Sequence, residues 1–152
     1  MVARGWTLAS AESCTGGLVG HRLTNVPGSS DYYMGSVTAY ANEAKMKLLG
    51  VQMDTLLEHG AVSAQTVREM ARGVREALGA SIGISVSGIA GPGGGSPEKP
   101  VGLVWFGLSA ADGDWAFEEH FDGDRLSIKA QAADYALQLG LEYLEGRLSG
   151  SD

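Results

Sequence analysis

The 152-residue chain is poor in residues that support several kinds of site. It has one cysteine, Cys14, which excludes an internal disulfide and a multi-cysteine zinc site. Its three histidines lie far apart and show no metal-ligand spacing, so a zinc site or a Ser-His-Asp triad is a poor interpretation. No apolar run reaches the roughly 18 residues of a membrane span. The beginning of the chain also lacks the pattern of a signal peptide.

Acidic residues outnumber basic residues. The chain has 11 Lys and Arg against 18 Asp and Glu, a formal net charge of −7. This charge argues against holding nucleic acid by counterion release, whereas a small phosphorylated ligand needs only a local cluster of donors. The length predicts one domain over residues 1–152. We therefore expect a soluble, cytoplasmic protein with a small-molecule partner, and neither a nucleic acid nor a membrane as partner.

Glycine is abundant, with 23 residues, about twice the average usage of roughly 7 %. Hydrophobic periodicity predicts strands and helices in alternation. The expected strands are 6–11, 35–41, 81–87, 101–109 and 115–121, and the expected helices are 17–26, 42–49, 54–59, 63–78 and 125–148. Asn42, Asp54 and Ser63 are predicted helix caps. This order predicts an α/β protein: a single three-layer domain with a mixed, mostly parallel sheet and an antiparallel hairpin at one edge.

The stretch 11–17 (Ala-Glu-Ser-Cys-Thr-Gly-Gly) combines a carboxylate, three candidate nucleophiles and two glycines between an expected strand and an expected helix. Exposed hydroxyl groups beside free backbone N–H groups suit a nucleophile or an anion site. Two simpler interpretations stay open. Glu12, Ser13 and Thr15 could cap the next helix, and Cys14 could be a small buried residue.

With histidine a poor candidate for a base, lysine is the next one. Lys45 lies one turn into the helix after the second expected strand, but it can deprotonate serine only if its pKa falls towards neutrality. The alternative is an ordinary exposed lysine. Segment 88–100, rich in glycine and proline, follows a strand and exposes N–H groups that suit phosphate or an oxyanion. Arg125 could add a phosphate contact or be a plain surface residue.

Five motifs follow one another along the chain, and their order resembles that of a known family. They are Ala11-Glu12-Ser13-Cys14-Thr15-Gly16-Gly17, Tyr40-Ala41-Asn42-Glu43-Ala44-Lys45, Ser87-Gly88-Ile89-Ala90-Gly91-Pro92-Gly93-Gly94, Glu98-Lys99-Pro100-Val101-Gly102 and Gly123-Asp124-Arg125. In this arrangement the chain resembles the C-terminal domain family of the competence/damage-inducible protein CinA. That family includes stand-alone nicotinamide-nucleotide amidohydrolases, and the resemblance runs from about Gly5 to Leu148.

The resemblance implies hydrolysis of the carboxamide of nicotinamide mononucleotide by a serine amidohydrolase, without a metal or cofactor. Carried onto this chain, it implies Ser13 as nucleophile, Lys45 as base and Tyr40 beside them. The residues expected to bind substrate are Thr15, Gly16, Gly17, Ser87, Gly88, Gly91, Gly93, Gly94 and Arg125. We expect the donors for the oxyanion near Thr15 and Gly16.

Two other functions stay open. The chain could be a nucleotide-binding regulatory module without turnover, associated with the competence/damage response, or a cysteine hydrolase that uses Cys14. The family pattern also differs at one point: its members generally carry a helix before the first strand, whereas only Met1 to Gly5 precede it here. A face left uncovered in this way could be covered by another subunit, which makes a homo-oligomer an expectation.

Overall fold

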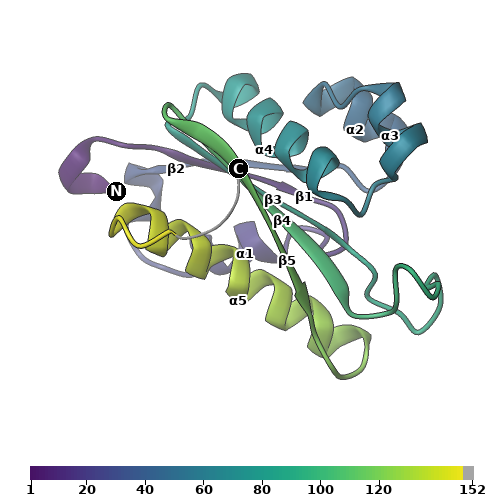
Figure 1. Ribbon diagram of the computed structural model, residues 1–152. Coiled ribbons are helices and arrows are strands. Elements are labelled where there is room, and N and C mark those ends of the chain that lie inside the picture. Colours follow the sequence, from purple (N-terminus) through teal and green to yellow (C-terminus); the bar gives the residue numbers. More distant parts are fainter. Residues whose placement is uncertain (149–152) are drawn as a thin grey trace.

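A five-stranded mixed sheet forms the middle layer of the computed structural model, which describes residues 1–148 (Figure 1). Its strands are β1 (Leu8–Glu12), β2 (Tyr33–Thr38), β3 (Ile82–Gly88), β4 (Leu103–Ala110) and β5 (Gly113–His120). The helices are α1 (Leu18–Thr24), α2 (Asn42–Leu49), α3 (Met53–His59), α4 (Ala64–Leu78) and α5 (Arg125–Leu144), with short 3-10 turns η1 (Val2–Arg4) and η2 (Ser29–Asp31).

The strand order is β2-β1-β3-β4-β5. β1 pairs in parallel with both β2 and β3, whereas β3 with β4 and β4 with β5 are antiparallel pairs. The β4–β5 hairpin therefore forms one edge of the sheet. The predicted α/β class, with a mixed sheet and a hairpin edge, is confirmed.

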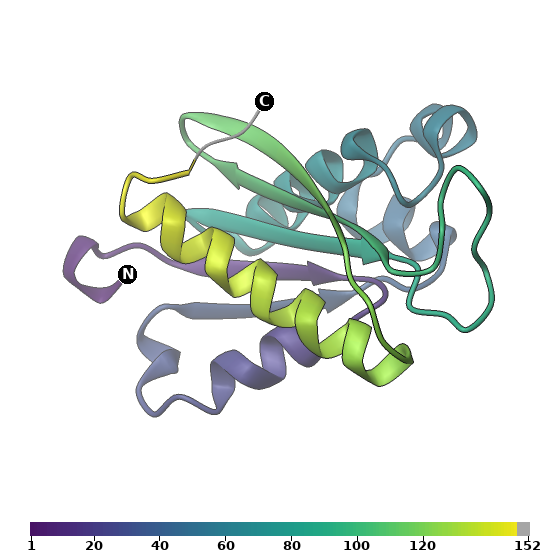
Figure 2. The same ribbon diagram turned by 60° about the horizontal axis from the view of Figure 1, so that its bottom comes forward.

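Helices cover both faces of this sheet and complete three layers (Figure 2). α1 and α5 lie on one face, and α4 lies on the other with α2 and α3 packed against it. Side chains alternate along β1 accordingly: Leu8 belongs to the core under α1 and α5, while Ala9 and Ala11 belong to the core under α4. The period of two along a strand thus supplies both layers from one short segment.

Small residues let α4 approach the sheet closely. A Cβ atom on Gly83 would lie 2.1 Å from the carbonyl oxygen of Ala71, and one on Gly107 would lie 2.1 Å from that of Val67. Between them, the Ser85 hydroxyl donates to the same Val67 carbonyl at 2.6 Å. The small residues of the 81–87 strand therefore reflect backbone-to-backbone contact between helix and sheet.

Several predicted boundaries were wrong in detail. β2 ends at Thr38 because the chain leaves the sheet there, and the Tyr40 carbonyl accepts from the Lys45 side chain. α5 ends at Leu144, before the predicted 148, where Gly146 adopts a left-handed φ of 68°. Ser63 caps α4 as predicted, but Asn42 and Asp54 do not cap: each lies inside its helix, and no side chain caps α2 or α3.

Candidate active site

The candidate site lies where the carboxyl ends of β1 and β3 meet. The connection from β1 leads to β2 on one side, and the next strand, β3, lies on the other side of β1. Such a reversal of strand order opens a crevice outside the carboxyl ends of the two strands. Ser13 follows β1 directly, and Ser87 and Gly88 end β3, so both strands deliver polar groups to this crevice.

Ser13 and Lys45 contact each other in this crevice. Lys45 extends from α2, and its Nζ lies 2.9 Å from the Ser13 Oγ and donates to the Tyr40 carbonyl oxygen at 2.8 Å. The lysine residue is 1 % exposed. Burial lowers the pKa of Lys45 below its usual range, because the charged form loses its hydration; the neighbouring Cys14 opposes this with a smaller effect. With a lowered pKa, a larger fraction of the lysine is the neutral amine, which can accept a proton from a neighbouring hydroxyl.

Cys14 lies beside Ser13 and Lys45, and burial shifts its pKa in the opposite direction to that of Lys45. It is 7 % exposed, and burial raises the pKa of its thiol to about 11. Because the thiolate is the nucleophilic form, a thiol with this pKa is inert near neutral pH. The interpretation of Cys14 as a small buried residue fits this geometry.

A cavity of about 200 Å³ opens over the pair. Its lining includes six of the residues expected at the site, namely Ser13, Tyr40, Lys45, Ser87, Gly88 and Arg125. Tyr40 and Arg125 are exposed at its edge, where the Arg125 guanidinium donates to the Tyr40 hydroxyl at 3.3 Å. Arg125 also donates to the Gly91 carbonyl at 2.6 Å, which ties the glycine-rich loop to the start of α5.

Other expected substrate-binding residues have different partners. The buried Thr15 hydroxyl donates to Glu12, the Gly17 amide donates to the same carboxylate, and the Gly16 amide donates to the Ser13 carbonyl. These three donors are engaged inside the turn, so an oxyanion site near Thr15 and Gly16 would use other backbone N–H groups of the turn, and it stays a prediction. Gly93 and Gly94 lie exposed in the loop, outside the cavity lining.

Glu12 is the residue whose importance the sequence least revealed. It is fully buried on β1, and its carboxylate accepts five hydrogen bonds of 2.7–3.2 Å. The donors are the Thr15 and Ser36 hydroxyls and the amides of Gly17, Val19 and Gly20. Positive φ angles at Gly16 and Gly17, 61° and 105°, fold the turn so that these amides point back at Glu12. Glu12 thereby fixes the turn that carries Ser13.

We expect Glu12→Gln to lower the free energy of unfolding by about 3 kcal/mol, because an amide nitrogen cannot accept from buried donors. Urea unfolding of the variant and its parent measures the change. Glu43→Gln, on the exposed start of α2, is the matched control and should change little. A loss below about 1 kcal/mol for Glu12→Gln would show that the five bonds contribute less than their geometry indicates.

Four further lining residues were not among those predicted at the site, namely Asn42, Ala61, Val62 and Ala90. Asn42 was interpreted as a helix cap but lines the cavity, and Ala61 and Val62 line it from the α3–α4 connection. Asn42 shares its motif with Tyr40 and Lys45, so its position beside them was a usable signal. Nothing in the local sequence marks Ala61 and Val62, since apolar residues before a helix are ordinary.

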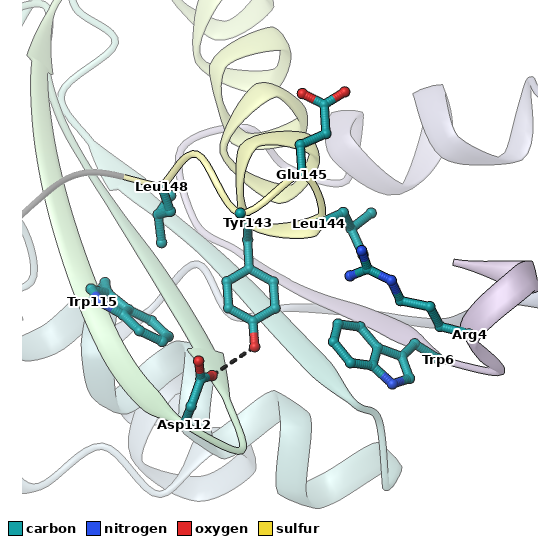
Figure 3. A pocket seen from close by; sticks show the side chains of 9 residues that line it. Arg4, Trp6, Asp112, Trp115, Tyr143, Leu144, Glu145 and Leu148 are labelled. Carbon is teal, nitrogen blue, oxygen red and sulfur yellow. Dashed lines mark hydrogen bonds between the residues drawn. The ribbon is translucent and has the colours of Figure 1, made fainter.

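A larger cavity, of about 450 Å³, lies at the other end of α5 (Figure 3). Tyr143 lies between Trp6 and Trp115, with ring centroids 6.1 and 5.7 Å away, and its hydroxyl donates to Asp112 at 2.6 Å. Burial, with the Asp112 carboxylate as a second cause, raises the pKa of Tyr143 to about 12. The rings join the end of α5 to the β4–β5 turn and the N-terminal segment, and this cavity shares no lining residue with the one over Ser13.

Residues 1–148 contain neither a metal-binding cluster nor a membrane-spanning helix. No cluster of three or more His, Cys, Asp or Glu side chains suited to hold a metal ion occurs among these residues. None of the helices described for the chain combines the length and apolar character needed to cross a membrane.

Comparison with known proteins gives consistent matches. Residues 1–144 match the family model described as "CinA C-terminal domain". A "CinA-like protein" of Salinibacter ruber is 57 % identical over 136 residues, covering 90 % of this chain and 33 % of that relative. "Nicotinamide-nucleotide amidohydrolase PncC" of Enterobacter agglomerans is 51 % identical over 140 residues, covering 91 % of this chain and 85 % of that protein. The chain thus spans about a third of the first relative's length and most of the second's.

A solved structure matches as well. The competence damage-inducible protein A from Klebsiella pneumoniae subsp. pneumoniae MGH 78578 has a TM-score of 0.91 and 40 % sequence identity with this chain. The match covers 95 % of this chain and 89 % of the other. Sequence and fold therefore point to the same family.

Proposed function

The chain belongs to the CinA C-terminal domain family, and on that premise we propose that it hydrolyses the carboxamide of nicotinamide mononucleotide. The products are nicotinate mononucleotide and ammonia. The observation that carries the proposal is the contact of 2.9 Å between the Ser13 Oγ and the buried Lys45 Nζ, inside a cavity beside β1 and β3. The named activity of the Enterobacter relative supplies the substrate.

Ser13 is the nucleophile and Lys45 the general base in this proposal. The neutral amine accepts the Ser13 proton while Oγ forms a bond to the amide carbon. The tetrahedral intermediate then breaks its C–N bond, and ammonia leaves with the proton from Lys45. Water, deprotonated by the same amine, attacks the acyl-enzyme. The C–Oγ bond then breaks, Lys45 returns its proton to the Ser13 Oγ, and the carboxylic acid product leaves and ionises. The Tyr40 carbonyl, at 2.8 Å from Nζ, orients the lysine throughout.

The size of the cavity supports a division of the substrate between two parts of the site. About 200 Å³ is below the roughly 300–1,000 Å³ of pockets that enclose drug-sized ligands. In the proposal, the carboxamide ring enters beside Ser13 and Ser87, and the ribose phosphate lies along the exposed Tyr40 and Arg125. A guanidinium suits the phosphate, because it can donate two parallel hydrogen bonds.

The direct test is ammonia release from nicotinamide mononucleotide by the purified protein. Stoichiometric formation of ammonia and nicotinate mononucleotide supports the proposal. Saturable binding in calorimetry without ammonia release, by protein shown to be folded, would select the nucleotide-binding module without turnover instead.

Replacing Cys14 should leave the reaction intact. We expect Cys14→Ser and Cys14→Ala to keep kcat within about threefold of the parent, because a thiol with a pKa of about 11 is not a nucleophile at neutral pH. Two variants are needed since Cys14→Ala also opens space in the cavity wall. Initial rates of ammonia release measure the effect. Inactivity of both variants, with unfolding midpoints unchanged, would favour a cysteine hydrolase.

A further inference from the structure

We infer that Lys99 is a positioning residue that joins two walls of the cavity over Ser13 and Lys45, and thereby sets how tightly substrate is held. One wall is the glycine-rich loop between β3 and β4, and the other is the connection between α3 and α4. The inference rests on the proposed function for the identity of the substrate, but the link itself is a property of the unliganded protein.

On the loop side, hydrogen bonds hold the backbone around Lys99. The loop is closed at its base, where the Ile89 amide donates to Leu103 at 2.9 Å and the Gly102 amide donates to Ile89 at 2.8 Å. Further out, the Ser96 amide donates to the Lys99 carbonyl at 2.9 Å, and the Lys99 amide donates to the Ser96 Oγ at 3.1 Å. This reciprocal pair orders the turn from which the Lys99 side chain leaves the loop.

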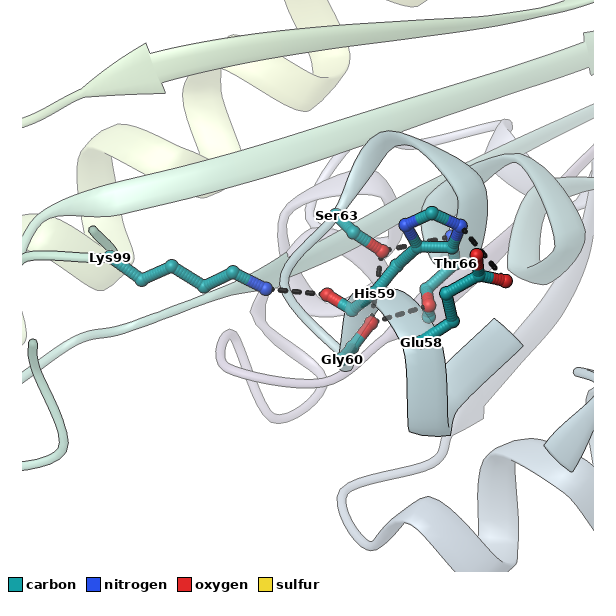
Figure 4. Close-up of polar contacts among 6 residues, drawn as sticks. All are labelled: Glu58, His59, Gly60, Ser63, Thr66 and Lys99. Atoms are coloured by element: carbon teal, nitrogen blue, oxygen red, sulfur yellow. Dashed lines mark hydrogen bonds and ion pairs between the residues drawn. The ribbon is translucent and has the colours of Figure 1, made fainter. Parts of the chain in front are cut away.

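On the helix side, the Lys99 Nζ donates to the His59 carbonyl oxygen at 2.5 Å (Figure 4). His59 is the last residue of α3, so its carbonyl has no partner one turn further along the helix. A cation at this end also interacts favourably with the helix dipole. The half-buried lysine is therefore held at α3 by both a hydrogen bond and charge.

The contact at His59 reaches the cavity through the residues that follow it. The Gly60 carbonyl accepts from the hydroxyls of Ser63 at 2.9 Å and Thr66 at 2.7 Å, which anchors the connection to α4 (Figure 4). Ala61 and Val62, inside this anchored connection, line the cavity. A movement of His59 therefore displaces that wall.

The loop carries the opposite wall in the same way. Ala90, at its start, lines the cavity, and the adjacent Gly91 carbonyl accepts from Arg125 at 2.6 Å. The loop is thus held on one side by Arg125 from α5 and on the other by its own Lys99 reaching α3. Losing Lys99 would free the second side and let the two walls separate, without touching the Ser13–Lys45 contact.

The variants that test this are Lys99→Met, which keeps the length but removes the donor, and Lys99→Arg, which keeps a donor and charge. Lys47→Met, on the exposed face of α2, is the matched control. Hydrogen exchange in the unliganded proteins should become about tenfold faster over 57–66 and 89–102 in Lys99→Met. Exchange should stay near the parent's in Lys99→Arg and Lys47→Met.

Steady-state kinetics with nicotinamide mononucleotide gives the second measurement. We expect KM of Lys99→Met to rise about tenfold, with kcat changed less than about twofold, and Lys99→Arg to recover most of the affinity. Unchanged exchange in both segments would overturn the inference, even with a raised KM, because Lys99 would then act on the ligand directly. Faster exchange in Lys99→Met, together with a parent protein that releases no ammonia, would support the link and refute the proposed function instead.

Discussion

Ser13→Ala is expected to lower kcat for ammonia release by about 10⁴-fold or more, the scale seen when a nucleophile is removed from a serine hydrolase. The proposed acyl-enzyme cannot form without Oγ, and the buried thiol of Cys14 cannot replace it. Binding should survive, because Ser13 contributes one of several lining groups. Stopped assays of ammonia release and calorimetry with nicotinamide mononucleotide measure the two effects separately.

Ser10→Ala is the matched control for this variant. Ser10 is also buried, lies on β1 and pairs its hydroxyl with Tyr33 at 2.9 Å, so its removal disturbs the same strand outside the cavity. A Ser13→Ala enzyme that keeps more than about 1 % of the parent rate, after contamination is excluded, would remove Ser13 from the role of nucleophile.

Lys45→Met is expected to lower kcat by about 10²–10⁴-fold, the usual contribution of a general base. The methionine fills the same space but cannot accept the Ser13 proton. In the parent, kcat should rise with pH and level off below the ordinary lysine pKa of 10.5, since burial lowers the pKa of Lys45. The variant should lack this rise. Lys47→Met is again the matched control, and its pH profile should follow the parent's.

The same lowered pKa predicts a stability effect of defined sign. Between the folded-state pKa of Lys45 and the unfolded value of 10.5, the unfolded chain binds more protons. Stability is therefore fully present above 10.5 and is lost as the pH falls through the folded-state pKa. Urea unfolding across this window should show a more positive slope of stability with pH in the parent than in Lys45→Met, because the raised pKa values of Cys14, Tyr135 and Tyr143 act on both proteins alike. An identical pH slope in both proteins would mean that Lys45 is not perturbed by burial.

Local sequence was sufficient for much of the fold. The period of two in the strands, the helical spacing of 63–78 and the cap at Ser63 all depend on neighbours close in the chain, and they were predicted correctly. Boundaries such as the ends of β2 and α5 were predicted less well. The Tyr40 carbonyl accepts a hydrogen bond from the Lys45 side chain and does not pair in the sheet. Gly146, with a left-handed φ, follows the end of α5 and lies before Leu148.

Sequence by itself determined the candidates at the site, namely a hydroxyl-rich turn after a strand, few possible bases and a long glycine-rich loop. The choice of Ser13 as nucleophile and Lys45 as base came from the family resemblance. Tertiary structure alone decided which groups meet. Lys45 contacts Ser13 across 32 positions of the chain, and Lys99 contacts His59 across 40. Burial, which lowers the pKa of Lys45 and raises that of Cys14, is a property of the whole packed domain. No local pattern encodes it, because the surrounding atoms come from α2, β1 and β3 together.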